Sequence, residues 1–272
     1  MISQVAALSA FAESGEDAPA VQFPPIENVI EWPAFFGDGQ FWAFNKISLI
    51  CLIAFAVPTL LFLMAGRGDA ENPGKLRVMA EGIVGFVEEQ IAKPGIGHGY
   101  EPYVPLLTAF FMFIAIGNLF EVIPFFQMPM NARMGPPLVL AIVAWLMFMA
   151  VGLKHNGFSY ITGVVWPKSI ENPAMRAFVG FIEFFSTFIV RPFSHAVRLF
   201  ANMLAGHILL ITFSVLVIAT FKLAPIKILG FLGAFPGLVA FTAFEVGVSF
   251  IQGFVFAILA AVYIGTSLHP EH

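Results

Sequence analysis

The sequence predicts an all-α integral membrane protein, and its composition and its long apolar runs are the basis of that prediction. Of the 272 residues, 59% are apolar and 11% are charged, and the mean hydropathy is +0.88. An average soluble domain has about a quarter of its residues charged, so this chain has too few to cover a surface in water. Several apolar runs reach the roughly 20 residues that cross a bilayer as a helix. We expect about five transmembrane crossings and one amphipathic helix in the plane of the membrane.

The same composition excludes several classes of function. Acidic residues outnumber basic ones, 17 to 13, and no basic stretch is present that would neutralise the phosphates of a nucleic acid. A single cysteine, Cys51, leaves no disulfide framework and no thiolate metal site, and the six histidines lack metal-binding spacing. No Gly-rich phosphate loop, HExxH or GxSxG motif occurs. We therefore expect no metal, no cofactor, no nucleic-acid partner and no catalytic chemistry in this chain itself.

The chain is predicted to consist of an acidic lead and one membrane-embedded domain. Residues 1–43 contain acidic side chains but no lysine or arginine. They also lack the cationic start and apolar core of a cleavable signal peptide. We expect residues 1–43 to lie on the extracytoplasmic side and residues 44–272 to form the membrane-embedded domain.

The apolar runs give the positions of the expected helices. The five crossings are predicted over residues 44–64, 103–126, 137–153, 174–219 and 238–266. The second and third are joined by a turn containing Pro129, Asn131 and Gly135, so we expect them to form a helical hairpin. Residues 74–93 place apolar and charged side chains on opposite sides of a helix, which is typical of a helix that lies on the membrane.

The fourth run is unusual in its length. Residues 174–219 far exceed what one simple crossing requires, so this helix must be steeply tilted or bent. We expect it to pair with the last helix, after a loop that contains Pro225 and Pro236.

The distribution of basic residues predicts the orientation. Seven of the thirteen lysines and arginines follow the first and third crossings, and four lie in the other connecting segments. Cytoplasmic segments carry the excess of such residues. We therefore expect the N-terminus outside and the C-terminus in the cytoplasm.

Arg198 is the residue inside the apolar runs that most needs an explanation. A charged side chain at the bilayer centre costs about 2.5–3.5 kcal/mol on insertion scales. Its guanidinium stays protonated at any working pH, so it can hold a carboxylate or repel a cation but cannot relay a proton. Arg191, Ser194 and Asn202 share its face of the helix to within about 40°. The alternative is a structural arginine that reaches the interface or pairs with a buried acid.

A second polar environment is predicted farther along the same run. His207 lies nine residues after Arg198, about 180° round the helix and about 13 Å along it. Glu245 and Gln252 are seven residues apart and share one face of the last helix. Because a buried glutamate needs a partner or a proton, we expect His207 and Glu245 to form a proton relay. The alternative is that His207 is an ordinary core histidine.

Two further carboxylates each have two interpretations. Glu121 follows Asn118 by one helical turn near the outer end of the second crossing, and it is either an entrance carboxylate or an interfacial residue. Glu183 lies in the inner part of the long run and is open to the same two interpretations.

Three motifs resemble those of a known family. The run RPFSHAVRLFANMLAGH, from Arg191 to His207, resembles the signature of subunit a of the F-type ATP synthase, whose pattern R-L-F-x-N-x-x-A-G is matched from Arg198 to Gly206. NLFEVIP, beginning at Asn118, and QGFVF, beginning at Gln252, match as well and in the same order. The resemblance covers most of the chain from the first crossing onward.

The resemblance implies a proton-translocating stator subunit in a bacterial cell membrane. Such a subunit forms two half-channels against a rotating ring of c subunits, and Arg198 matches the arginine that faces the ring carboxylate. By matching position, Ser194, Asn202 and Gln252 are polar residues near it, and His207 with Glu245 matches a spatial pair. The implied partners are the c-ring, the peripheral-stalk b subunits, the F1 sector indirectly, the lipid bilayer and protons.

One position departs from the family pattern. Relatives often have a carboxylate fourteen residues before the arginine, whereas Glu183 is fifteen before Arg198 and Phe184 occupies the expected position. One residue corresponds to about 100° of rotation around a helix, so the side chain of Glu183 is expected about 100° away from the family position. Its assignment to the inner half-channel is therefore open.

A different class of function remains as the alternative. A self-contained secondary proton-coupled transporter could use Arg198 and Glu245 to bind a substrate. Such folds usually show internal repeats and broken helices, and the two halves of this sequence show no self-similarity.

Overall fold

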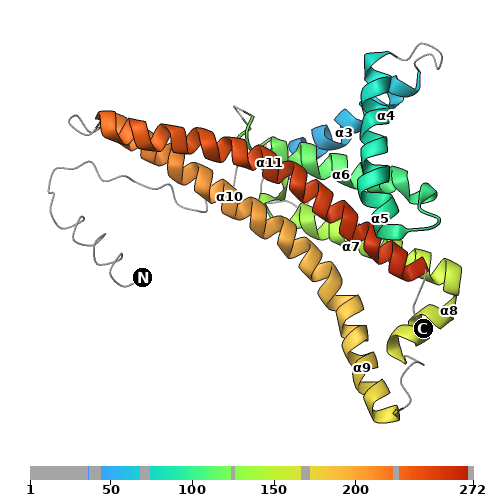
Figure 1. Ribbon diagram of the computed structural model, residues 1–272. Coiled ribbons are helices and arrows are strands. Elements are labelled where there is room, and N and C mark those ends of the chain that lie inside the picture. The colour runs from blue at the N-terminus through green and yellow to red at the C-terminus, as the bar shows by residue number, and fades with distance from the viewer. Residues whose placement is uncertain are drawn as a thin grey trace.

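The computed structural model describes residues 36, 44–67, 74–123, 126–166, 172–222 and 227–268, and these residues are largely helical (Figure 1). The α-helices are α3 (Lys46–Gly66), α4 (Lys75–Val87), α5 (Lys93–Ile96), α6 (Val104–Leu119), α7 (Gly135–Asn156), α8 (Phe158–Val165), α9 (Pro173–Phe185), α10 (Arg191–Lys222) and α11 (Lys227–Leu268). Two π-helical turns, η1 (Glu88–Ala92) and η4 (Ser186–Val190), and two 3-10 turns, η2 (Glu101–Tyr103) and η3 (Met130–Ala132), complete the order. The predicted acidic lead, apart from Phe36, lies outside the described residues.

The prediction of an all-α membrane protein is confirmed. Five helices among the described residues are long and apolar enough to cross a membrane: Lys46–Gly66, Glu101–Leu119, Gly135–Asn156, Pro173–Ile218 and Leu232–Leu268. The amphipathic helix expected over 74–93 is α4, which runs across the direction of α11 and continues through η1 and α5 (Figure 1).

Local chemistry explains where two of the helices begin. The side chain of Asn45 accepts a hydrogen bond of 3.0 Å from the backbone N–H of Ser48 and so caps α3. The side chain of Asn172 caps α9 in the same way, accepting 3.0 Å from the N–H of Ala174. Pro173 takes the first helical position, where its missing N–H costs nothing.

The connection between the last two long helices is shorter than expected. α11 begins at Lys227, eleven residues before the predicted start of the last crossing, and Pro236 lies inside the helix rather than in a loop. Neighbouring helices can satisfy the backbone groups that a proline frees within a membrane, and α10 packs along α11.

The expected hairpin of the second and third crossings is wrong. α6 and α7 both pack against α11, but they do not form an extensive antiparallel pair with each other. α6 also ends at Leu119, seven residues before its predicted end, so Glu121 lies in the turn that follows it. The part of the connecting segment from Met128 to Ala132 folds into the molecule, since all five of these residues are buried.

The long fourth run forms one bent helical rod, as predicted. α9, η4 and α10 are continuous from Pro173 to Lys222, and α10 lies beside α11 over much of its length (Figure 1). α9, which precedes η4 in the chain, points away from α11 (Figure 1). The pairing of this rod with the last helix is therefore confirmed.

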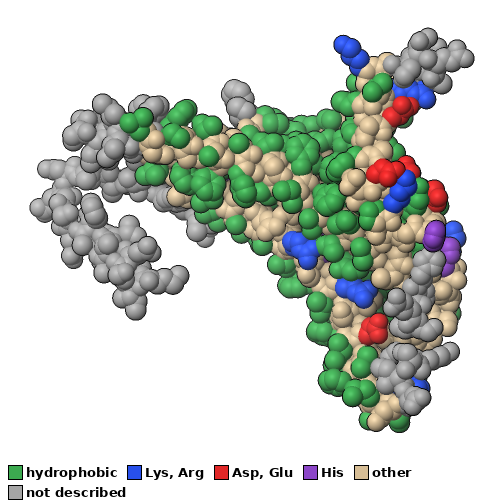
Figure 2. All heavy atoms as spheres, viewed as in Figure 1, with side chains coloured by type: hydrophobic (Ala, Val, Ile, Leu, Met, Phe, Trp, Pro, Cys, Tyr) green, Lys and Arg blue, Asp and Glu red, His purple; other side chains and the backbone are tan. Residues whose placement is uncertain are grey.

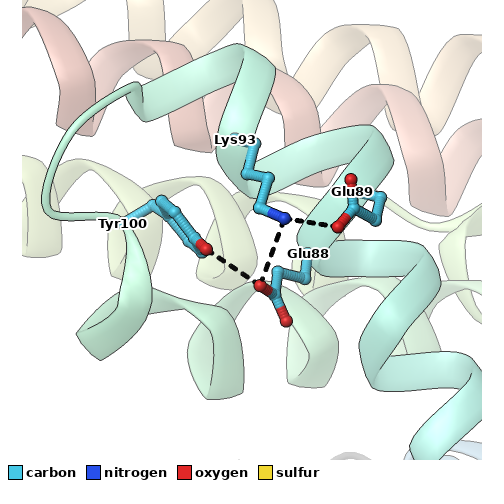
Figure 3. A network of polar contacts seen from close by, with 4 residues as sticks. All are labelled: Glu88, Glu89, Lys93 and Tyr100. Atoms are coloured by element: carbon cyan, nitrogen blue, oxygen red, sulfur yellow. Dashed lines mark hydrogen bonds and ion pairs between the residues drawn. The ribbon is translucent and has the colours of Figure 1, made fainter.

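A polar network fixes the connection from α5 to α6 (Figure 3). The hydroxyl of Tyr100 donates a 2.9 Å hydrogen bond to Oε1 of Glu88, and Nζ of Lys93 lies 3.5 Å from the same oxygen and also pairs with Glu89. The hydrogen bond to Glu89 raises the pKa of Lys93, and the hydrogen bond to Glu88 raises the pKa of Tyr100. The π turn η1 supplies both carboxylates, so it ties the end of the amphipathic helix to the start of the next crossing.

Candidate functional site

Arg198 lies on the outward face of α10. Its side chain is exposed, as are those of Ser194 and Asn202, one turn before and one turn after it. Figure 2 shows isolated basic side chains among hydrophobic and neutral ones on this part of the surface. Among the described residues, no carboxylate lies within ion-pair distance of Arg198.

Two of the exposed residues next to this polar line are alanines. Ala201 and Ala205 are exposed beside Asn202. Small residues on a membrane helix allow another backbone to approach closely. The guanidinium of Arg198 is therefore presented on a surface that another helix can approach.

A second set of polar side chains is buried behind α10. Nδ1 of His207 lies 3.4 Å from Oε1 of Glu121, with 5% and 1% of their side chains exposed. Glu245 of α11 is also buried, and its carboxylate packs against Gly206, the residue before His207. Three ionisable groups, from the turn after α6 and from α10 and α11, thus meet in the interior of a membrane domain.

The partner of His207 differs from the one expected. Glu121 is the contacting carboxylate, whereas Glu245 is not within ion-pair distance of His207 in the described part of the chain. Glu245 instead lies against Gly206, the residue before the histidine, where a methyl group would come 2.3 Å from its Oε1. The predicted pair is therefore part of a three-member cluster that Glu121 completes.

The remaining predicted site residues divide between the two environments. Asn118 is fully buried on α6, three residues before Glu121 of the buried cluster. Gln252 is buried on α11, and no hydrogen bond among the described residues joins it to Arg198. Asn202 and Ser194 stay on the exposed face with Arg198.

Several polar residues of the site were not singled out from the sequence. Asn131 is fully buried in η3 and donates a 2.7 Å hydrogen bond from Nδ2 to Oδ1 of Asn118. Ser249, on α11, donates to the backbone oxygen of Glu245. His195 is buried one turn before Arg198, with its ring 4.1 Å from that of Phe256. The sequence contains one sign that the segment around Asn131 could be buried. Met128 and Met130 are apolar residues in a segment that otherwise has the composition of a turn.

The π turn η4 lies between Glu183 and Arg198. A π turn contains one residue more than a turn of α-helix. The fifteen residues from Glu183 to Arg198 therefore turn the helix through the same angle as fourteen residues of regular α-helix. Fourteen residues bring Glu183 to within about 40° of the direction of Arg198, whereas fifteen would put it about 60° away on the other side. Glu183 is half-buried there.

A side chain from another helix supports this turn. The indole N–H of Trp145, on α7, donates a 3.1 Å hydrogen bond to the carbonyl oxygen of Thr187 inside η4. The ring of Trp145 also packs edge-on against Phe188. The extra residue is thus held at a defined place in the rod.

Comparison with known proteins bears on this geometry. The family model described as "ATP synthase A chain" matches residues 47–265. The chain belongs to the ATP synthase subunit a family. It is 35% identical to ATP synthase subunit a of Frankia alni, over 91% of this chain and 87% of that protein. It is 37% identical to that of Rhodococcus erythropolis, over 84% and 83%, and 32% identical to that of an Arthrobacter species, over 95% and 96%.

Family membership and the long apolar helices both place the site in a membrane protein. The chain is a multi-pass membrane subunit of the ATP synthase complex. Both the exposed arginine and the buried cluster lie on or beside its membrane-spanning helices.

The π turn gives a first testable prediction. Deletion of Ile189, an exposed residue of the turn, should convert η4 to α-helix and keep Glu183 in its present direction, so ATP-driven proton pumping by the purified complex in liposomes should be retained. Insertion of one alanine between Ile189 and Val190 should rotate Glu183 by about 100° and reduce pumping. The reverse order of the two variants would contradict the proposed register.

Gly206 gives a second prediction. In Gly206→Ala the new methyl group must displace the carboxylate of Glu245, the flexible end of a side chain, so the complex should assemble. Because misplacement of a reacting group by about 1 Å can cost about 10²-fold, ATP-driven pumping should fall by up to that factor. Gly82→Ala is the matched control, since no atom lies near the added methyl group there. Equal pumping by the two variants would argue against a role for the position of Glu245.

Proposed function

We propose that this chain is the proton-conducting stator subunit of the F-type ATP synthase, in which Arg198 separates two half-channels that face a rotating ring of c subunits. The observation that carries the proposal is the exposed guanidinium of Arg198 on a membrane-spanning helix, without a carboxylate in ion-pair distance among the described residues. A permanent cation in an apolar span needs an anion. The carboxylate of a neighbouring ring subunit would supply it.

The charge of Arg198 would act in three ways. It favours release of the proton from an arriving ring carboxylate, because a nearby positive charge stabilises the ionised form. It holds that carboxylate ionised while the ring passes. It also repels a hydrated proton, so that protons do not cross directly from one half-channel to the other.

The two half-channels would correspond to the two polar regions along the rod. The cluster of His207, Glu121 and Glu245 lies about 13 Å from Arg198 in one direction along α10. Glu183 lies about 20 Å away in the other direction, and the π turn brings it close to the direction of Arg198. An arginine between two proton-exchanging regions is the arrangement that the proposal requires.

The orientation follows from the basic residues. With the N-terminus outside, α6 would cross outward, so Glu121 and the segment after it would lie on the outer side. The cluster would then belong to the outer half-channel and Glu183 to the inner one. Residues 44–272 would act as a single membrane-embedded domain, with the c-ring against α10 and the b subunits of the peripheral stalk holding it against the F1 sector.

The energetics require many protons. One charge moved through 100 mV supplies about 2.3 kcal/mol, which is too little for one ATP molecule. Several protons must therefore pass for each ATP, and a ring that carries one proton per subunit adds their energies.

Arg198→Ala tests the function directly. The complex should assemble, but proton-driven ATP synthesis and ATP-driven pumping in liposomes should be abolished, because no charge remains to ionise the ring carboxylate. Arg67→Ala, which removes an exposed arginine at the end of α3, is the control and should leave both activities intact. Coupled ATP synthesis by an assembled Arg198→Ala complex would contradict the proposal.

The contact between His207 and Glu121 gives a second test. His207→Ala and Glu121→Gln should each slow pumping by on the order of 10²-fold, the lower range for removal of a proton-transfer group. If they act as a pair, the double variant should be about as slow as the slower single variant. His155→Ala, at an exposed position on α7, is the control. Losses that multiply in the double variant would mean that the two groups act independently.

A further inference from the structure

Part of the segment that joins α6 to α7 is buried, although it connects two membrane-spanning helices. All five residues of Met128–Ala132 are buried, whereas connecting segments normally run over the surface. The 3-10 turn η3 packs against α3, α6, α7 and α10. The segment therefore fills a space among four helices.

Apolar contacts hold the segment in place. Met128 and Met130 form a buried cluster with Ile47, Ile50 and Ala54 of α3 and with Phe120. Met130 also lies so close to Gly117 of α6 that a methyl group there would come 2.8 Å from its sulfur. These contacts fix the backbone from which the side chain of Asn131 extends.

Asn131 and its neighbours leave polar atoms without partners. Asn131 is bonded to Asn118, but Oδ1 of Asn131 and Nδ2 of Asn118 have no hydrogen-bond partner among the described residues. The same holds for Oε2 of Glu121 and for Oε2 of Glu245, and Oε1 of Glu121 makes no hydrogen bond beside its 3.4 Å contact with Nδ1 of His207. Four of these five atoms are acceptors, and the set contains one unused donor.

A dry interior would not sustain this set. A buried polar group without a hydrogen bond is costly, and buried water typically makes about three hydrogen bonds to such groups. Water can donate to Oδ1 of Asn131 and to the oxygens of Glu121 and accept from Nδ2 of Asn118. The unused atoms therefore fit a small group of water molecules between η3 and the carboxylates.

We propose that Met128–Ala132 forms the inner wall of a water-filled entrance to the outer half-channel, and that Asn131 is a positioning residue that orders water between Asn118 and Glu121. The inference rests on the proposed function, because it concerns the route by which protons reach Glu121. On this view the amide of Asn131 neither gains nor loses a proton. It holds the water through which a proton travels.

Two substitutions of Asn131 separate this role from a packing role. Asn131→Leu keeps the volume of the side chain but removes its hydrogen-bonding atoms, whereas Asn131→Ser is smaller and leaves polar atoms and room for water. If Asn131 orders water, the leucine variant should conduct poorly and the serine variant should conduct well. If Asn131 only fills space, the order should be reversed.

The measurement is proton-driven ATP synthesis by the intact complex in liposomes, with assembly checked by co-purification of the subunits. Asn131→Leu should lower the rate by about tenfold or more, which corresponds to an added barrier of 1.4 kcal/mol, while Asn131→Ser stays near the unmodified rate. If the leucine complex does not assemble, Asn131→Val replaces it with the same expectation. An apolar variant that retains its rate, or a serine variant that loses it, would overturn the inference.

The outcome is independent of the test of the proposed function. If Arg198→Ala abolishes coupling while Asn131→Leu leaves it intact, the half-channel proposal stands and the role of Asn131 falls. If the assembled Arg198→Ala complex still makes ATP, the proposed function falls whatever the variants of Asn131 do.

Discussion

The permanent charge of Arg198 is the constraint on which the rest of the structure depends. A guanidinium cannot be neutralised in the membrane, so it must be paired within the chain or offered to a partner. Its exposure on α10, beside Ala201 and Ala205, fits the second solution. The buried carboxylates lie instead behind the helix, out of ion-pair distance, so they do not compete for the charge.

The acids of the cluster make few hydrogen bonds to the described residues. Glu245 fits against α10 because Gly206 has no side chain, and Ser249 turns its hydroxyl to the backbone rather than to the carboxylate. A carboxylate locked by several donors would hold its charge firmly and exchange protons poorly. On the proposed mechanism, the small number of fixed protein donors around Glu121 and Glu245 suits groups that take up and release protons.

The sequence predicted the membrane-spanning helices, which depend on the local composition of the chain. It did not predict the contacts between segments that are distant in the sequence. Runs of apolar residues give the five crossings, because a spanning helix must satisfy its own backbone and face lipid. They do not show that Met128–Ala132 turns inward, since that depends on the space among four helices. The contact of His207 with Glu121 was missed for the same reason, because 86 residues separate the two. Glu183 was left open because the π turn has no signal in the sequence itself, and its support comes from Trp145 on another helix.

The buried side of α10 explains why a proton would have to leave this chain in order to cross. Between His195 and the cluster at Gly206 and His207, the buried residues of α10 are all apolar: Ala196, Leu199 and Met203. Apolar side chains packed without water offer no route for a proton. On the proposed mechanism, the remaining route follows the exposed face, where Arg198 repels a proton but attracts a carboxylate. A proton would therefore move from one half-channel to the other only when a ring subunit carries it, and this requirement would couple proton flow to rotation.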